Sequence, residues 1–190
     1  VSAADIITDT QGNVYITGHT DGAIDGADHQ GTSYFIAKYS AAGIRVWTRQ
    51  GGATSGETRG YGIAKDSQDN IYITGSTWDA LDGNTSSGVT DAFVAKYDSS
   101  GTWLWTRQRG ADSKYTTGNK IKIDSQDNVY LTGWTDGGVD GNTLTGTKDL
   151  ILFKFDSSGT RQWTQQIGAA GQDSCGTTIF IDAYDKIYTI

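Results

Sequence analysis

The sequence predicts an all-β protein, and three observations carry this prediction. Landmark aromatic residues recur every 57 or 58 positions, and each interval holds four short segments rich in β-branched and aromatic residues. Clusters of Gly, Asp, Asn and Ser separate these segments, as is typical of turns between antiparallel strands. No segment keeps a 3.6-residue apolar period between helix caps, so we expect essentially no helix.

The repeat is defined by three kinds of side chain that return at the same place in each copy. These structural residues are Tyr15, Tyr72, Tyr130 and Tyr188, then Trp47, Trp105 and Trp163, then Lys38, Lys96 and Lys154. The spacing divides the chain into units at about residues 4–59, 60–117 and 118–175, followed by a half unit at 176–190. Because the lysines recur in every copy within apolar segments, we interpret them as architectural, paired with a repeated Asp or reaching to water.

The second copy shows the four expected strands most clearly, at Tyr61–Asp66, Asn70–Thr77, Asp91–Asp98 and Trp103–Arg109. The first two strands are joined by DSQDN and the last two by DSSG. An Asp at the start of such a turn can accept backbone N–H groups, and the final Gly accepts a positive φ. These links therefore predict short hairpins.

A repeated four-stranded sheet predicts a β-propeller. Segments such as VYIT and FVAKY are apolar on both strand faces, which fits sheets packed between neighbours on both sides. Radial stacking of such sheets is the propeller arrangement, in which each sheet is one blade. About three and a half blades are present, so we expect either a segment of a longer propeller or one part of an oligomeric ring, and we favour the segment.

The motifs themselves resemble a known family. The pattern N-[VI]-Y-[IL]-T-G, followed by D-G-N, K-[YF]-D-x-x-G and W-T-[RQ]-Q, is similar to the bacterial β-propeller repeat called SBBP. This resemblance covers nearly the whole chain and implies a seven-bladed propeller in a secreted or surface-attached bacterial protein. The first copy departs from the pattern at Ser33 and Tyr34. The resemblance supplies no catalytic residues.

Composition excludes several classes of partner. The chain has 15 basic and 22 acidic residues, a net charge of −7, and no stripe of Lys and Arg, so we expect no nucleic-acid partner. Its apolar runs are too short to predict a membrane span. A single cysteine, Cys175, allows no internal disulfide. No signal-peptide pattern is visible in these residues, although we expect a protein that acts outside the cell or on its surface.

The long link between the second and third strands is acidic and rich in glycine. It carries carboxylates that recur from copy to copy, namely Asp25, Asp82, Asp91, Asp140 and Asp149. Carboxylate and carbonyl oxygens in such a loop suit Ca²⁺, although the EF-hand spacing is absent. The alternative is that these Asp residues only form turns by hydrogen bonding to the backbone. Calcium is therefore a possible ligand, and no cofactor is required.

Four aromatic residues break the repeat and are the predicted ligand-binding residues. They are Trp78, Trp103, Trp134 and Tyr115, at places where the other copies carry mainly polar residues. An aromatic ring beside Asp and Asn can stack on a sugar ring or anchor a protein partner. Partial burial under a loop or between blades is the alternative.

Catalysis has little support in the sequence. The two histidines, His19 and His29, stand ten residues apart in the first copy, which is a weak metal pattern. We therefore expect a non-catalytic extracellular scaffold that binds a protein or a polysaccharide. The alternatives are a structural protein that assembles into a ring or filament through open edge strands, and a fragment of a propeller enzyme with its active site elsewhere. Further partners would then be the remaining blades of a longer chain or symmetry-related copies.

Overall fold

The computed structural model describes residues 1–24, 26 and 31–190. The described residues form fourteen β-strands and no helix, which confirms the all-β prediction. Consequently none of them belongs to a helix that could cross a membrane.

The strands form three antiparallel sheets of four strands and one of two strands, each in sequence order. The first blade contains β1 (Ser2–Thr8), β2 (Val14–Thr20), β3 (Ser33–Tyr39) and β4 (Arg45–Gly51). The second contains β5 (Thr58–Lys65), β6 (Ile71–Thr77), β7 (Asp91–Tyr97) and β8 (Trp103–Arg109). The third contains β9 (Thr116–Ile123), β10 (Val129–Thr135), β11 (Asp149–Phe155) and β12 (Arg161–Ile167), and the half blade contains β13 (Ile179–Ile181) and β14 (Ile187–Thr189).

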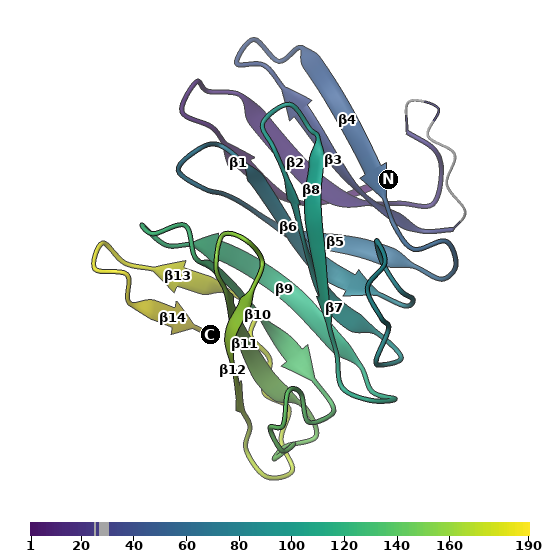
Figure 1. Cartoon of the computed structure of the whole chain (residues 1–190), viewed down its shortest axis with the longest axis vertical. Helices are drawn as coiled ribbons and strands as arrows, with labels where there is room; N and C mark the ends of the chain where they lie inside the picture. The colour runs from purple at the N-terminus through teal and green to yellow at the C-terminus, as the bar shows by residue number, and fades with distance from the viewer. Residues whose placement is uncertain (25, 27–30) are drawn as a thin grey trace.

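Successive sheets pack face to face as propeller blades (Figure 1). The first strand of each blade contacts the first strand of the next, because β5 touches both β1 and β9, and β9 touches β13. The fourth strands, β4, β8 and β12, are therefore the outer edges of the blades. Buried side chains of neighbouring blades share common core clusters, such as Tyr72 and Val94 with Ile121 and Leu131. Packing on both faces explains why β6 and β7 are buried along their whole length.

The first strands begin earlier than the sequence predicted. β5 starts at Thr58 and β9 at Thr116, two residues before the unit boundaries expected at 60 and 118. These polar residues join the strand because the hydroxyl of Thr58 lies 3.1 Å from that of Thr77, and Thr116 pairs with Thr135 in the same way. Buried hydroxyl pairs of this kind replace the apolar alternation that signals a strand in sequence.

The turn between the first two strands is built by the same Asp hydrogen bonds in each complete blade. In the second blade the Asp66 carboxylate accepts hydrogen bonds from the backbone N–H of Asn70 at 2.9 Å, its side-chain amide at 2.8 Å and the Tyr72 hydroxyl at 3.0 Å. The Lys96 ammonium lies 3.3 Å from the same carboxylate. Burial raises the pKa of Asp66, but these hydrogen bonds and Lys96 outweigh it and hold the pKa below 3.8. Asp9 and Asp124 accept equivalent bonds.

A second repeated contact joins each blade to the next through its outer strand. The Trp105 ring packs edge-on to Tyr72 with centroids 5.9 Å apart, and the Arg107 guanidinium carbon lies 5.2 Å from the centre of the Trp105 ring. Arg107 also donates to the carbonyl of Gly159 in the third blade at 2.8 Å. Gly159 has a φ of +83°, and a Cβ there would come within 3.1 Å of Trp105, so the close approach requires glycine. The same contact recurs between the first two blades.

Candidate binding site on the outer edge of the second blade

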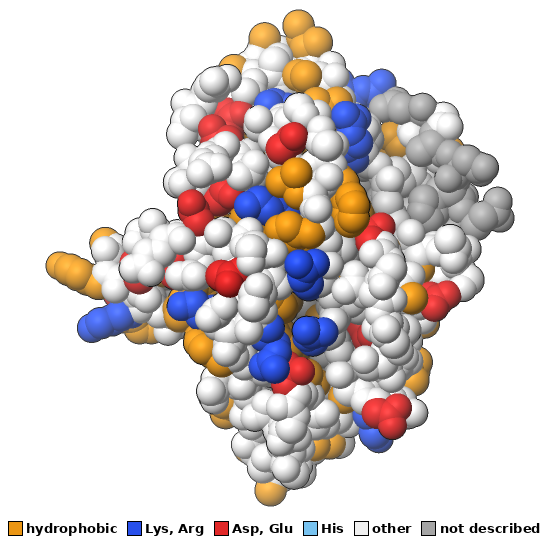
Figure 2. Space-filling view, viewed as in Figure 1, with side chains coloured by type: hydrophobic (Ala, Val, Ile, Leu, Met, Phe, Trp, Pro, Cys, Tyr) orange, Lys and Arg blue, Asp and Glu red, His pale blue; other side chains and the backbone are white. Residues whose placement is uncertain are grey.

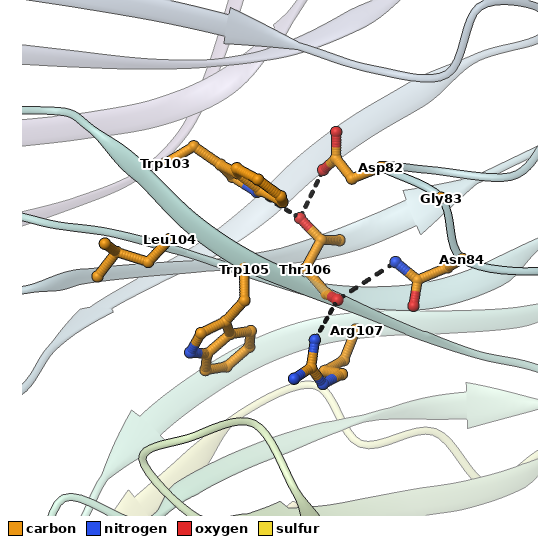
Figure 3. Close-up of a pocket in the computed structure, with 8 residues that line it drawn as sticks. All are labelled: Asp82, Gly83, Asn84, Trp103, Leu104, Trp105, Thr106 and Arg107. Atoms are coloured by element: carbon orange, nitrogen blue, oxygen red, sulfur yellow. Dashed lines mark hydrogen bonds between the residues drawn. The ribbon is translucent and has the colours of Figure 1, made fainter.

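A shallow pocket of about 370 Å³ lies on the outer edge of the second blade (Figure 3). It is lined by Asp82, Gly83, Asn84, Trp103, Leu104, Trp105, Thr106 and Arg107. The first three belong to the long loop between β6 and β7, and the others belong to β8. The loop thus folds back over the outer strand of its own blade, and the pocket forms between them. Hydrophobic side chains gather over β8 in the space-filling view, with Lys and Arg side chains beside them (Figure 2).

Trp103 is the exposed aromatic wall of this pocket. It is the first residue of β8, and 47% of its surface remains exposed. A register shift between Lys96 and Tyr97 leaves Leu104 unpaired as a bulge beside it. The indole Nε1–H donates to the Thr106 hydroxyl at 2.9 Å, which fixes the orientation of the ring along the strand. Trp105, in contrast, points away from Trp103 (Figure 3), toward the third blade.

The loop supplies the polar wall, and its backbone conformation positions two side chains. Asp82 and Gly83 have φ angles of 51° and 77°, so the chain turns sharply at these two residues. One Asp82 oxygen, Oδ2, accepts from the Thr106 hydroxyl at 2.5 Å. The Asn84 amide donates to the carbonyls of Leu81 at 2.8 Å and Thr106 at 3.2 Å. Leu81 is fully buried and anchors the loop to the blade.

The arrangement leaves an acceptor next to an apolar platform. Within the part of the chain that the structure describes, no donor contacts the second carboxylate oxygen of Asp82, Oδ1, and Asp82 is exposed to solvent. Trp103 lies near this carboxylate, because the indole N–H and Asp82 Oδ2 both contact the Thr106 hydroxyl. Such a pairing can bind a molecule that has a flat C–H surface and hydroxyl or N–H donors at its rim.

The third blade repeats the Asp–Thr hydrogen bond of this pocket, but an Arg side chain fills the place of the exposed tryptophan. Asp140 accepts from the Thr164 hydroxyl at 2.5 Å, as Asp82 does from Thr106. At the position of Trp103 stands Arg161, whose Nε lies 3.5 Å from the same Asp140 oxygen. The cation replaces the aromatic wall and pairs with the carboxylate. In the first blade the corresponding carboxylate, Asp25, lies outside the described residues.

The other predicted aromatic residues lie elsewhere on the blades. Trp78 follows β6, is 37% exposed and has the Arg59 guanidinium 5.7 Å from its ring. Tyr115 precedes β9 and is 43% exposed. Trp134 is partly buried in β10, with the Lys148 ammonium 4.5 Å from its ring centre. These three residues lie where second strands end and first strands begin, whereas Trp103 lies at the other end of a blade, on its outer strand.

The carboxylates predicted as calcium ligands have separate partners. Asp91 accepts from the backbone N–H of Ser87 and of Gly88 and from the Gln108 amide, each at 2.8 Å. Asp149 accepts the equivalent hydrogen bonds in the third blade, from Thr145, Gly146 and Gln166. Among the described residues, no three His, Cys, Asp or Glu side chains gather closely enough to hold a metal ion. This geometry is that of turn-forming carboxylates, and calcium binding stays a prediction.

Residues with potential chemical reactivity are placed as packing groups. His19 packs edge-on to Tyr61, with ring centroids 6.4 Å apart, and burial together with Arg59 lowers its pKa. Its predicted metal partner, His29, lies outside the described residues. Burial raises the pKa of the Cys175 thiol, which keeps this side chain protonated near neutral pH.

Sequence reasoning missed two residues of the pocket, Asn84 and Thr106. Both recur in the third copy, as Asn142 and Thr164. Their recurrence was the available signal, but it does not show that the loop folds back to the outer strand, which brings Asn84 to the Thr106 carbonyl.

Comparisons with known proteins agree with the fold. A family model described as "SBBP: Beta-propeller repeat" matches residues 1–24, 46–81 and 104–139, which together make up half of the chain. "Uncharacterized WD repeat-containing protein L264" of Acanthamoeba polyphaga mimivirus is 28% identical over 224 aligned residues, covering 85% of this chain and 16% of that protein. "Regulatory protein FlaEY" of Caulobacter vibrioides is 28% identical over 190, covering 88% of this chain and 20% of that protein. The chain thus spans a fifth or less of these curated relatives.

Proposed function

Because the chain belongs to the SBBP β-propeller repeat family, we propose that it is a non-catalytic scaffold that binds a protein or a polysaccharide outside the cell or on its surface. The observation that carries this proposal is that repeated and non-repeated residues occupy different places in the structure. The residues that recur in every blade are used in turns and blade contacts, whereas three of the four aromatic residues that break the repeat are exposed and the fourth, Trp134, is partly buried. Exposed aromatic side chains on a rigid scaffold are typical anchors for partners.

The names of the relatives fit an interaction role. One is called a WD repeat-containing protein and the other a regulatory protein.

The test is binding by the chain and by one variant that lacks the exposed aromatics. The variant carries Trp78→Ala, Trp103→Ala, Tyr115→Ala and Trp134→Ala together. We expect binding to immobilised glycans or to surface proteins of the source cells, and loss of that binding in the variant. The matched control is Tyr184→Ala, which removes an exposed aromatic residue from the half blade. If the variant binds as well as the unaltered chain, the aromatic residues do not form the binding surface and the proposal fails.

Self-assembly is a second candidate function, and the two end faces favour it. Ile6 is 59% exposed on the uncovered face of the first blade. Phe180 and Tyr188 are 60% and 52% exposed on the half blade, where they pack on each other. Apolar groups on these faces favour packing against another sheet, which a further blade of the same protein or a second copy can supply. Sedimentation of the chain against Ile6→Asp would show a lower mass for the variant if these faces join copies, and identical monomers would contradict assembly.

A further inference from the structure

We propose that the pocket on the outer edge of the second blade binds a neutral hexopyranose unit of a glycan. This inference rests on the proposed scaffold function and names the ligand class for one of its sites. The pocket of about 370 Å³ lies within the range of roughly 300–1,000 Å³ that small-ligand sites occupy. It therefore suits one or two sugar rings better than a large folded surface.

The platform of the site is the Trp103 indole. A hexopyranose ring presents several C–H groups on one face, and this face stacks on the π-surface of an aromatic ring. Trp103 is suited to this contact because its ring is nearly half exposed and is held in place by the Nε1 hydrogen bond to Thr106. Holding the ring in advance reduces the entropy lost on binding.

The acceptors for sugar hydroxyls stand beside the platform. The Asp82 carboxylate is oriented by Thr106 through Oδ2, so Oδ1 is left to accept a hydroxyl. The Asn84 amide nitrogen is used by the Leu81 and Thr106 carbonyls, so its oxygen is the remaining acceptor. Both residues are tied to β8 through Thr106, and Asn84 is also held by the carbonyl of the buried loop residue Leu81.

Charge selects a neutral sugar. The cation that lines the pocket is Arg107, and its donors are engaged with the carbonyls of Gly159 at 2.8 Å and Thr106 at 2.9 Å, while its plane lies against Trp105. These donors are thus already used, whereas one oxygen of the exposed Asp82 carboxylate has no donor among the described residues. This carboxylate repels uronic acids and other anionic sugars.

The edge of β8 is poorly suited to the main alternative, an extended peptide. A peptide that adds to a sheet edge needs the free carbonyl and N–H groups of the outer strand. Here the Thr106 carbonyl already accepts from Asn84 at 3.2 Å and from Arg107 at 2.9 Å. The loop thus covers the strand edge at the centre of the pocket while the side-chain platform stays open.

The third blade supplies an internal negative control. Its loop has the same Asp–Thr hydrogen bond, but Arg161 replaces the platform and pairs with Asp140 at 3.5 Å. We therefore expect one sugar site, in the second blade.

The test is a titration of the ¹⁵N-labelled chain with neutral tetrasaccharides, followed by the indole N–H resonances of its six tryptophans. The probes are cellotetraose, mannotetraose and chitotetraose, with tetragalacturonate as the anionic probe and an eight-residue Ser-rich peptide as the peptide probe. At least one neutral tetrasaccharide, at about 10 mM or below, should shift the Trp103 indole, which corresponds to the millimolar affinities of weak single sites. Tetragalacturonate and the peptide should not.

Variants separate the site from the fold. Trp103→Ala and Asp82→Asn should each weaken the neutral-sugar affinity about tenfold, as the loss of a contact worth about 1.4 kcal/mol predicts. Tyr184→Ala, which removes an exposed aromatic residue from the half blade, should leave the affinity unchanged, and the remaining indole spectrum shows that each variant is folded. The proposal is overturned if no neutral probe shifts the Trp103 indole, or if the peptide shifts it and the sugars do not. Either result leaves the proposed scaffold function standing. That function fails only if the variant lacking all four aromatic residues binds as well as the unaltered chain.

Discussion

The outer edges of the second and third blades share the same contact between loop and outer strand, which we call the frame. They differ in the side chain beside it, which is Trp103 in the second blade and Arg161 in the third. In both, a buried loop residue anchors the loop, and an Asp carboxylate accepts a Thr hydroxyl at 2.5 Å. Trp103 leaves the first pocket open, whereas Arg161 pairs with Asp140 and closes the second. The comparison teaches that the repeat builds the scaffold and that single departures from it create the surface. Changes to the frame should therefore cost stability, and changes at Trp103 should alter binding.

The largest effect should come from removing the Asp carboxylate of the turn between the first two strands of a blade. Asp66→Asn removes the charge that pairs with buried Lys96 at 3.3 Å, and it should lower the free energy of unfolding by about 3 kcal/mol. Asp124→Asn should cost less, about 2 kcal/mol, because Asp124 keeps its hydrogen bonds from Asn128 and Tyr130 but forms no ion pair with a Lys or Arg among the described residues. Urea unfolding measures both. Asp112→Asn, at an exposed Asp, is the matched control, and an equal loss in all three variants would contradict the account.

Acid should weaken this turn in both the second and the third blade. The pKa of Asp66 and of Asp124 is held below 3.8 in the folded chain, because hydrogen bonds outweigh the opposing effect of burial. Their stabilisation is therefore complete above the unfolded-state pKa of about 3.9 and is lost as the pH falls through the lower folded-state values. Unfolding free energies should be flat near pH 5 to 7 and should fall below about pH 4. A steeper loss in Asp66→Asn than in the unaltered chain would contradict this assignment.

The carboxylate at the start of the third strand gives a smaller, matched pair of effects. Asp91→Asn and Asp149→Asn each place an NH₂ group where two backbone N–H donors need an acceptor, so each should cost about 2 kcal/mol. Both residues are fully buried, so the two losses should agree closely. Thermal unfolding with and without urea measures the loss of stability in each variant. A clear difference between the two losses would contradict the equivalence of the two carboxylates.

The smallest effect should be that of calcium. The oxygens of Asp91 and Asp149 already accept N–H donors in both blades, so calcium should change the melting temperature by less than about 1 °C. Scans in calcium and in EDTA measure this directly. A rise of several degrees that Asp82→Asn or Asp140→Asn abolishes would show that the loops rearrange to hold the ion.

The sequence predicted the repeat, the strands and the turns because these depend on local residues. Asp66, Asn70 and Tyr72 stand within six positions of one another, and their hydrogen bonds follow from the turn. The pocket was harder to predict, because Asp82 and Thr106 meet across 24 positions only after the loop folds back over β8. Trp103 was singled out as a departure from the repeat, but its hydrogen bond to Thr106 and its position beside Asp82 come from tertiary structure.

Exchange of the two outer-edge residues tests the central claim most directly. The measurement is the binding of a neutral tetrasaccharide by the double variant Trp103→Arg and Arg161→Trp, read from the backbone N–H resonances of the loops at Asp82 and Asp140. The account predicts that the shifts move from the Asp82 loop to the Asp140 loop, with similar affinity, because the two frames are alike. Shifts that remain at the Asp82 loop would show that Trp103 is not the platform and would contradict the account.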